Sequence, residues 1–179
     1  MGKSLDLPFD PIQRAAEHWD REFGPSAEMK VATSIMRVQQ LLLARYDEIL
    51  RPYQLTFARY EALVLLVFSR RGELPMRVVG ERLMVHPTSA TNIIERLSRQ
   101  GYVRRRRNPR DGRGVLAVIT TDGRSVADRA TKDLMAARFG LDALPPARSE
   151  EVFQALRGIR RAAGDFTEPG AAGADLGGW

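Results

Sequence analysis

The sequence contains no cysteine and only two histidines, which removes several kinds of chemistry. Without cysteine the chain can form no disulfide, sense no peroxide through a thiol and hold no metal through thiolates. His18 and His86 lie far apart in the sequence and on different predicted helices, which argues against a histidine-rich zinc site. We therefore expect no metal and no other cofactor.

Long apolar runs are missing too. There is no stretch of about 18 apolar residues and no basic-plus-apolar leader, so we expect no membrane span and no secretory signal. The sequence also lacks an internal repeat, a Gly-rich phosphate loop, paired carboxylates and a nucleophile placed beside a base, which argues against an enzyme. These absences predict a cytoplasmic protein whose work is binding.

Positive charge is concentrated in one segment of the chain. The 179 residues have a formal net charge of +6, and residues 96–113 alone hold eight arginines and one aspartate, a local charge of +7. The remainder is therefore close to neutral. A cluster of arginines indicates a polyanionic partner, although a run of arginines taken by itself is equally consistent with a solvated face.

Residues 87–100 have the pattern of a two-sided helix. Pro87 suits the first helical position and Gly101 the residue just past the end. One side is an apolar stripe that faces a core, made of Ala90, Ile93, Ile94 and Leu97. The other side is polar and carries Thr88, Asn92, Glu95 and Arg99, flanked by Ser89, Thr91 and Arg96. Short hydrogen-bonding side chains come early and arginines late, which suits a helix that enters the DNA major groove end-on.

A basic hairpin is predicted directly after this helix. Proline, aspartate and glycine residues at 109–114 separate two β-prone runs, at 102–107 and 115–119, as in a hairpin connection. In the second run Val115, Ala117 and Ile119 alternate onto one face and can pack against the helix. Arginine suits bidentate contacts with phosphate and guanine, so the helix and hairpin together predict nucleic-acid binding.

The rest of the chain is expected to be helical. Asp10 caps a short helix that runs to about Phe23, and apolar residues spaced by three or four predict a long helix over 26–51. Further helices are expected at 56–70 and 75–84, after a cap at Thr121 and Asp122, and from near Arg148. The helices at 75–84 and 87–100 form a helix-turn-helix. The expected fold is mainly α with a small β-wing: a winged helix-turn-helix lobe plus a helical dimerisation region.

The chain divides into five expected parts. They are an N-terminal extension with a short helix (1–25), an N-terminal dimerisation helix (26–54), the winged DNA-binding lobe (55–120), C-terminal dimerisation helices (121–165) and a disordered tail (166–179). The helices of parts 26–54 and 121–165, called the outer helices, have more apolar surface than the small lobe can cover. This surplus predicts a homodimer. A two-fold dimer would place two recognition helices about 34–36 Å apart, matching a pseudo-palindromic operator in double-stranded DNA.

Residues 83–120 resemble the multiple-antibiotic-resistance regulator (MarR) family of winged-helix repressors. The shared features are the His-Pro-Thr-Ser-Ala-Thr helix start, the Asp-Gly-Arg of the wing, and residues 115–120 before Asp122-Gly123; the similarity extends over about residues 26–163. It implies that Arg110 and Arg113 enter the minor groove, with Asp111 bracing the wing through Arg113. From the helix it implies major-groove contacts by Thr88, Ser89, Thr91, Asn92 and Arg96.

The resemblance also implies a small-molecule effector. Many members release DNA when an aromatic acid or another amphipathic molecule binds between the dimer helices and the winged lobe. Side chains of suitable type stand at Trp19, Arg37, Tyr46, Arg59 and Tyr60, although core packing or interhelical hydrogen bonding is the simpler interpretation of each. Two departures are Met84, where the family often has glycine, and the N-terminal helix with Trp19.

Two functional hypotheses remain. The first is a dimeric, sequence-specific transcriptional regulator, a repressor released by a small amphipathic or aromatic ligand. The alternative is an architectural protein that binds DNA with the same surface but without sequence preference.

Overall fold

The computed structural model describes residues 6–109, 111 and 114–167, and over these residues the protein is mainly helical. It confirms the predicted fold class, a mainly α protein with a small β-wing. No helix in these ranges is long and apolar enough to cross a membrane. The elements are α1 (Pro11–Glu22), α2 (Ala27–Leu50), α3 (Phe57–Phe68), β1 (Glu73–Pro75), α4 (Met76–Arg82), α5 (Pro87–Arg99), β2 (Val103–Arg107), β3 (Val115–Ile119), α6 (Thr121–Ala136) and α7 (Pro146–Ala162).

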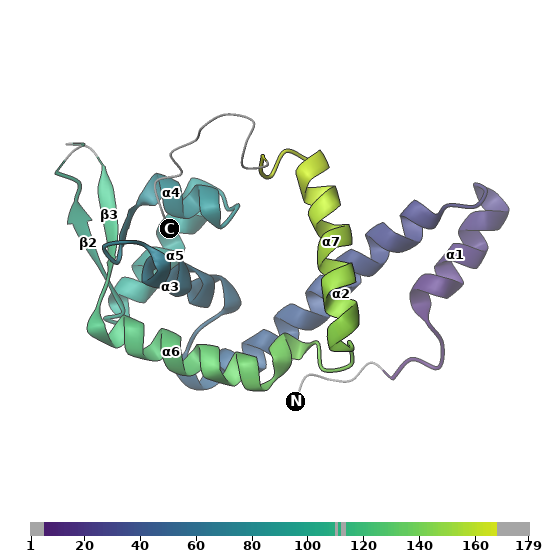
Figure 1. Cartoon of the computed structure of the whole chain (residues 1–179), viewed down its shortest axis with the longest axis horizontal. Helices are drawn as coiled ribbons and strands as arrows, with labels where there is room; N and C mark the ends of the chain where they lie inside the picture. The colour runs from purple at the N-terminus through teal and green to yellow at the C-terminus, as the bar shows by residue number, and fades with distance from the viewer. Residues whose placement is uncertain (1–5, 110, 112–113, 168–179) are drawn as a thin grey trace.

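The elements fall into a compact lobe and a set of outer helices (Figure 1). Helices α3, α4 and α5 and the small sheet form the lobe, and the β2–β3 hairpin projects from its edge. Helix α6 starts beneath the sheet and leads away from the lobe toward α7. Helix α2 contacts α6 near the lobe and leads away toward α1. The N-terminal helix α1 packs against α2.

Side chains cap the starts of α1, α2, α5 and α6. The Asp10 carboxylate accepts hydrogen bonds from the backbone N–H groups of Ile12 (2.8 Å) and Gln13 (3.3 Å), as predicted. The predicted cap of α6 was wrong by one residue, because Thr120, which directly follows β3, takes that role. Its hydroxyl oxygen accepts from the Gly123 N–H at 3.0 Å.

The three strands form one antiparallel sheet in the order β1-β3-β2. In register, Leu74 of β1 and Arg105 of β2 flank Ala117 of the central strand. The sequence did not predict β1, because three residues are too few to show an alternating pattern. As a result Pro75 ends a strand, and the helix expected to begin there starts at Met76.

The core lies where α3, α5, α6 and β3 meet. Its fully buried side chains include Leu63 and Leu66 of α3, Ile94 and Leu97 of α5, and Leu134 of α6. Burial of Ile94 and Leu97 confirms the apolar stripe predicted for residues 87–100 and turns the opposite side of α5 toward solvent. The core therefore determines which side of α5 can meet a partner.

The turn between α4 and α5 is tight. The backbone N–H of Val85 donates to the Gly80 carbonyl at 3.1 Å, and Met84 has a φ of 51°. This left-handed conformation favours glycine, which is the physical reason why the family often has glycine at this position. Met84 adopts the same conformation with a side chain. The Met84 side chain is 80% exposed, so no packing opposes it.

The outer helices keep apolar side chains exposed in the single chain. On α2 these include Val31, Val38 and Leu41, and on α7 they include Val152, Phe153 and Ile159, which is 51% exposed. Contiguous apolar patches of this kind mark interaction surfaces.

Candidate nucleic-acid interface

The polar side of α5 faces solvent next to the wing. Thr88, Ser89, Asn92 and Arg96 are all exposed. Thr91 is half-buried, and its hydroxyl donates to the Pro87 carbonyl at 3.0 Å, so this oxygen remains available only as an acceptor. The five helix residues singled out from the sequence thus share one side of one helix.

His86 caps this helix. Its Nδ1 accepts a hydrogen bond from the backbone N–H of Thr88 at 3.3 Å, which satisfies one of the free donors at the start of α5. At the other end Gly101 has a φ of +78°, as expected for a glycine just past a helix. Both ends of the candidate recognition helix are therefore held by short-range contacts.

Arg105 and Arg106 of the consecutive arginines on β2 form ion pairs with acids of the same chain. Arg105 donates to Glu95 of α5 at 3.1 Å, and Arg106 donates to Glu73 of β1 at 2.6 Å. These exposed pairs add little stability; the first connects the hairpin to α5 and the second connects β2 to β1. The local charge of +7 counted over residues 96–113 does not include these two ion-pair partners, and only Glu95, close in sequence, could have signalled the first pair.

The end of the wing is closed by backbone hydrogen bonds. The N–H of Asn108 donates to the Gly114 carbonyl at 2.8 Å, and the N–H of Gly114 donates to the Asp111 carbonyl at 2.9 Å. The predicted minor-groove residues Arg110 and Arg113 lie outside the described residues. The brace expected between Asp111 and Arg113 therefore stays a prediction.

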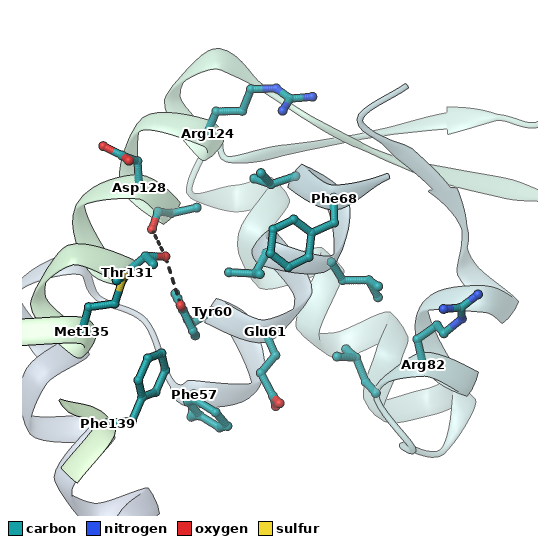
Figure 2. A pocket seen from close by; sticks show the side chains of 15 residues that line it. Phe57, Tyr60, Glu61, Phe68, Arg82, Arg124, Asp128, Thr131, Met135 and Phe139 are labelled. Atoms are coloured by element: carbon teal, nitrogen blue, oxygen red, sulfur yellow. Dashed lines mark hydrogen bonds between the residues drawn. The ribbon is translucent and has the colours of Figure 1, made fainter. Parts of the chain in front are cut away.

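A second candidate site is a cavity of about 880 Å³ between α3, the end of α4 and α6 (Figure 2). The Thr131 hydroxyl donates to the Ala127 carbonyl at 2.7 Å, so the Tyr60 hydroxyl, 3.0 Å away, donates to Thr131. This bond holds Tyr60 in the cavity wall. The lining is mainly apolar and aromatic: Phe57, Tyr60, Glu61, Val64, Leu65, Val67, Phe68, Arg82, Leu83, Arg124, Ala127, Asp128, Thr131, Met135 and Phe139.

The structure brings one of the five predicted ligand residues, Tyr60, into this cavity. Tyr46 is buried behind it: its ring stacks on Phe57 at 4.5 Å between centroids, and its hydroxyl donates to the Phe139 carbonyl at 3.0 Å. Burial raises the pKa of Tyr46, with a further contribution from the negative charge of Glu61. Tyr46 therefore supports the wall and remains neutral.

The other three predicted ligand residues lie elsewhere. Trp19 packs on Phe23 within α1, and Arg37 lies in a groove between α1 and α2. Arg59 donates to the Gln54 carbonyl at 2.9 Å. Sequence analysis missed Glu61 and Phe68, although a lone acid in the otherwise apolar stretch after Tyr60 was a usable signal. No cluster of three or more metal-ligating side chains occurs among the described residues.

Known proteins are similar to this chain in sequence and in fold. A family model described as the MarR family matches residues 53–114. The crystal structure of Sco5413, a MarR family transcriptional regulator from Streptomyces coelicolor, is similar to this chain with 58% sequence identity and a TM-score of 0.74. That match covers 78% of this chain and 97% of Sco5413.

Two further relatives show how far the similarity extends. Sco3205, a MarR family regulator from Streptomyces coelicolor solved in complex with DNA, has 27% identity and a TM-score of 0.69, covering 84% of this chain and 95% of that one. The organic hydroperoxide resistance transcriptional regulator of Bacillus subtilis is 30% identical over 86 residues, 48% of this chain. The chain spans just over half the length of the first curated relatives that it matches.

Proposed function

This chain belongs to the MarR family of transcriptional regulators, and from that premise we propose that it is a dimeric, sequence-specific DNA-binding repressor that a small ligand releases from its operator. The single observation that carries the proposal is the exposed polar side of α5, held at a set angle to the arginine-bearing wing. The family consists of transcriptional regulators, which sets the enzymatic hypothesis aside.

The proposed DNA contacts come from α5 and from the tip of the wing. Asn92 and Arg96 are the helix side chains best suited to read bases, because an amide pairs with adenine and a guanidinium with guanine. Arg105 and Arg106 orient the wing through their ion pairs with Glu95 and Glu73. The full proposed set is Thr88, Ser89, Thr91, Asn92 and Arg96 from the helix, with Arg110, Asp111 and Arg113 from the wing.

Dimerisation is proposed through the exposed apolar sides of α2 and α7. A second copy related by a two-fold axis would cover both patches and would present two copies of α5 to one side of the DNA. Exposed Val38 on α2 and Ile159 on α7 support this surface. One copy of α5 could read only half of a pseudo-palindromic operator.

Effector control is proposed to act through the cavity between α3 and α6. Helix α6 links the wing to the outer helices, and Tyr60 ties it to α3 through Thr131. The spacing between α3 and α6 can differ between the DNA-free and the DNA-bound protein. A ligand that binds the DNA-free spacing more tightly would shift the population toward the DNA-free state. Release of a repressor from its operator follows from that shift.

The proposal predicts different outcomes for two substitutions on α5. Fragments enriched from genomic DNA supply the operator, and fluorescence anisotropy measures affinity against salt concentration. Asn92→Ala should change which base is preferred by about 1–3 kcal/mol at one position of each half-site. Arg96→Ala should weaken binding, and should reduce the slope of log affinity against log salt by about 0.9 if it removes one phosphate contact.

Arg148→Ala on α7 removes the same charge at a 70% exposed position far from α5, and should leave operator affinity unchanged. Competition with random-sequence DNA separates the two DNA-binding hypotheses, because a specific regulator should prefer its operator by at least about 10³-fold. Equal affinity for random DNA would support the architectural alternative instead.

A further inference from the structure

The cavity wall contains a carboxylate, that of Glu61, which forms no ion pair with any described residue of the chain. Glu61 lies on α3 one helical turn after Phe57, with Tyr60 and Phe68 on the same wall (Figure 2). Within the described part of the chain its carboxylate has neither an ion pair nor a hydrogen bond. The site therefore combines one negative charge with several aromatic rings.

The other charged groups of the lining are directed elsewhere. The Arg124 guanidinium packs against Gly72, where an added Cβ would overlap Nη2, and it points away from the cavity in Figure 2. The Asp128 carboxylate lies 2.8 Å from Lys132 Nζ on the outer side of α6. The guanidinium of Arg82 extends away from Glu61 in Figure 2, and it makes no contribution to the pKa shift of the Glu61 carboxyl.

Glu61 is an exposed residue at the wall of the cavity, so its carboxylate keeps contact with water. Its apolar neighbours partly desolvate the carboxyl and raise its pKa, and no positive group contributes to that shift. A bound cation would restore the missing electrostatic partner. A bound carboxylate would instead place a second negative charge beside Glu61, and the two like charges would repel each other.

We propose that this cavity binds a lipophilic organic cation, a protonated or quaternary amine or an equivalent onium ion, with Glu61 as its counter-ion. The rings of Phe57, Phe68 and Phe139 provide apolar surface and cation–π contacts for such a ligand. A volume of about 880 Å³ suits a drug-sized molecule. This assignment of ligand class rests on the proposed effector role of the cavity and is opposite in charge to the aromatic acids that the family resemblance implied.

Two probes of matched shape and opposite charge test the ligand class. Tetraphenylphosphonium and tetraphenylborate have nearly the same size, and isothermal titration calorimetry on the full chain measures both. We expect the phosphonium to bind at least tenfold more tightly. The net charge of +6 would favour the borate, so a preference for the phosphonium must come from local groups of the cavity, and the variants at position 61 separate the carboxylate from the aromatic rings.

Variants at position 61 tie the preference to one side chain. Glu61→Gln keeps the size and should lose at least tenfold in phosphonium affinity, while borate binding should become tighter because the repulsion by the carboxylate is removed. Glu61→Lys should reverse the preference. Glu151→Gln makes the same chemical change on α7 at a 70% exposed position and should bind both probes as the wild type does. Circular dichroism melts check that each variant is folded.

A parallel anisotropy measurement separates the ligand class from the effector role. Phosphonium binding that depends on Glu61 and releases DNA supports both. The same binding without DNA release supports the ligand class and overturns the effector role. Tighter borate binding, affinity unaffected at Glu61→Gln, or no binding of either probe overturns the ligand class, whatever happens to DNA binding by the free protein.

Discussion

Gly123→Ala is expected to lower the free energy of unfolding by about 3 kcal/mol. Gly123 lies buried in the first turn of α6, where an added Cβ would overlap the carbonyl oxygen of Tyr102 and lie 3.0 Å from Ile119 Cγ1. That oxygen cannot move aside easily, because it accepts hydrogen bonds from the N–H (3.0 Å) and the hydroxyl (3.1 Å) of Thr120. Either α6 or the base of the wing must shift.

Urea denaturation followed by circular dichroism measures this loss, and Gly158→Ala is the matched control. Gly158 lies inside α7 with no atom within 4 Å of an added Cβ. The same substitution should therefore stabilise the protein, by up to about 1 kcal/mol, since alanine loses less backbone entropy in a helix. If the Gly123→Ala variant is as stable as the wild type, α6 does not contact Tyr102 this closely in solution.

Ile159→Asp is expected to convert the proposed dimer to a monomer and to weaken binding to the proposed operator at least 100-fold, or about 2.8 kcal/mol. Ile159 is 51% exposed on the apolar side of α7, and a two-fold interface would bury it twice. An unpaired carboxylate in such an interface costs about 3–5 kcal/mol. Monomers would then have to occupy each half-site independently.

Sedimentation velocity measures the change in mass, and anisotropy with the enriched operator measures the loss of affinity. Gln154→Asp introduces the same charge on the opposite side of α7, where it should leave both the mass and the affinity unchanged. A wild-type protein that sediments as a single chain while binding its operator tightly would rule out the dimer.

Local patterns were enough to predict most of the helices. Asp10, Pro87 and Gly101 mark helix ends through contacts within a few residues, and the apolar stripe through Ile94 and Leu97 reports the buried side of α5. The polar side of α5 follows directly, because a helix with one side in a core must present the other to solvent. Short-range information therefore sufficed for the helix half of the candidate DNA site.

What the sequence determined by itself was the winged helix-turn-helix order of elements and the clustering of arginine beside one polar helix face. Only the tertiary structure decided that Arg105 and Arg106 pair with acids, that residues 73–75 complete the sheet, and that Glu61 lines an aromatic cavity while Trp19 and Arg37 lie outside it. The physical reason is distance along the chain. Periodicity and caps arise from neighbours within one or two turns, whereas ion pairs and cavities depend on which remote segments meet.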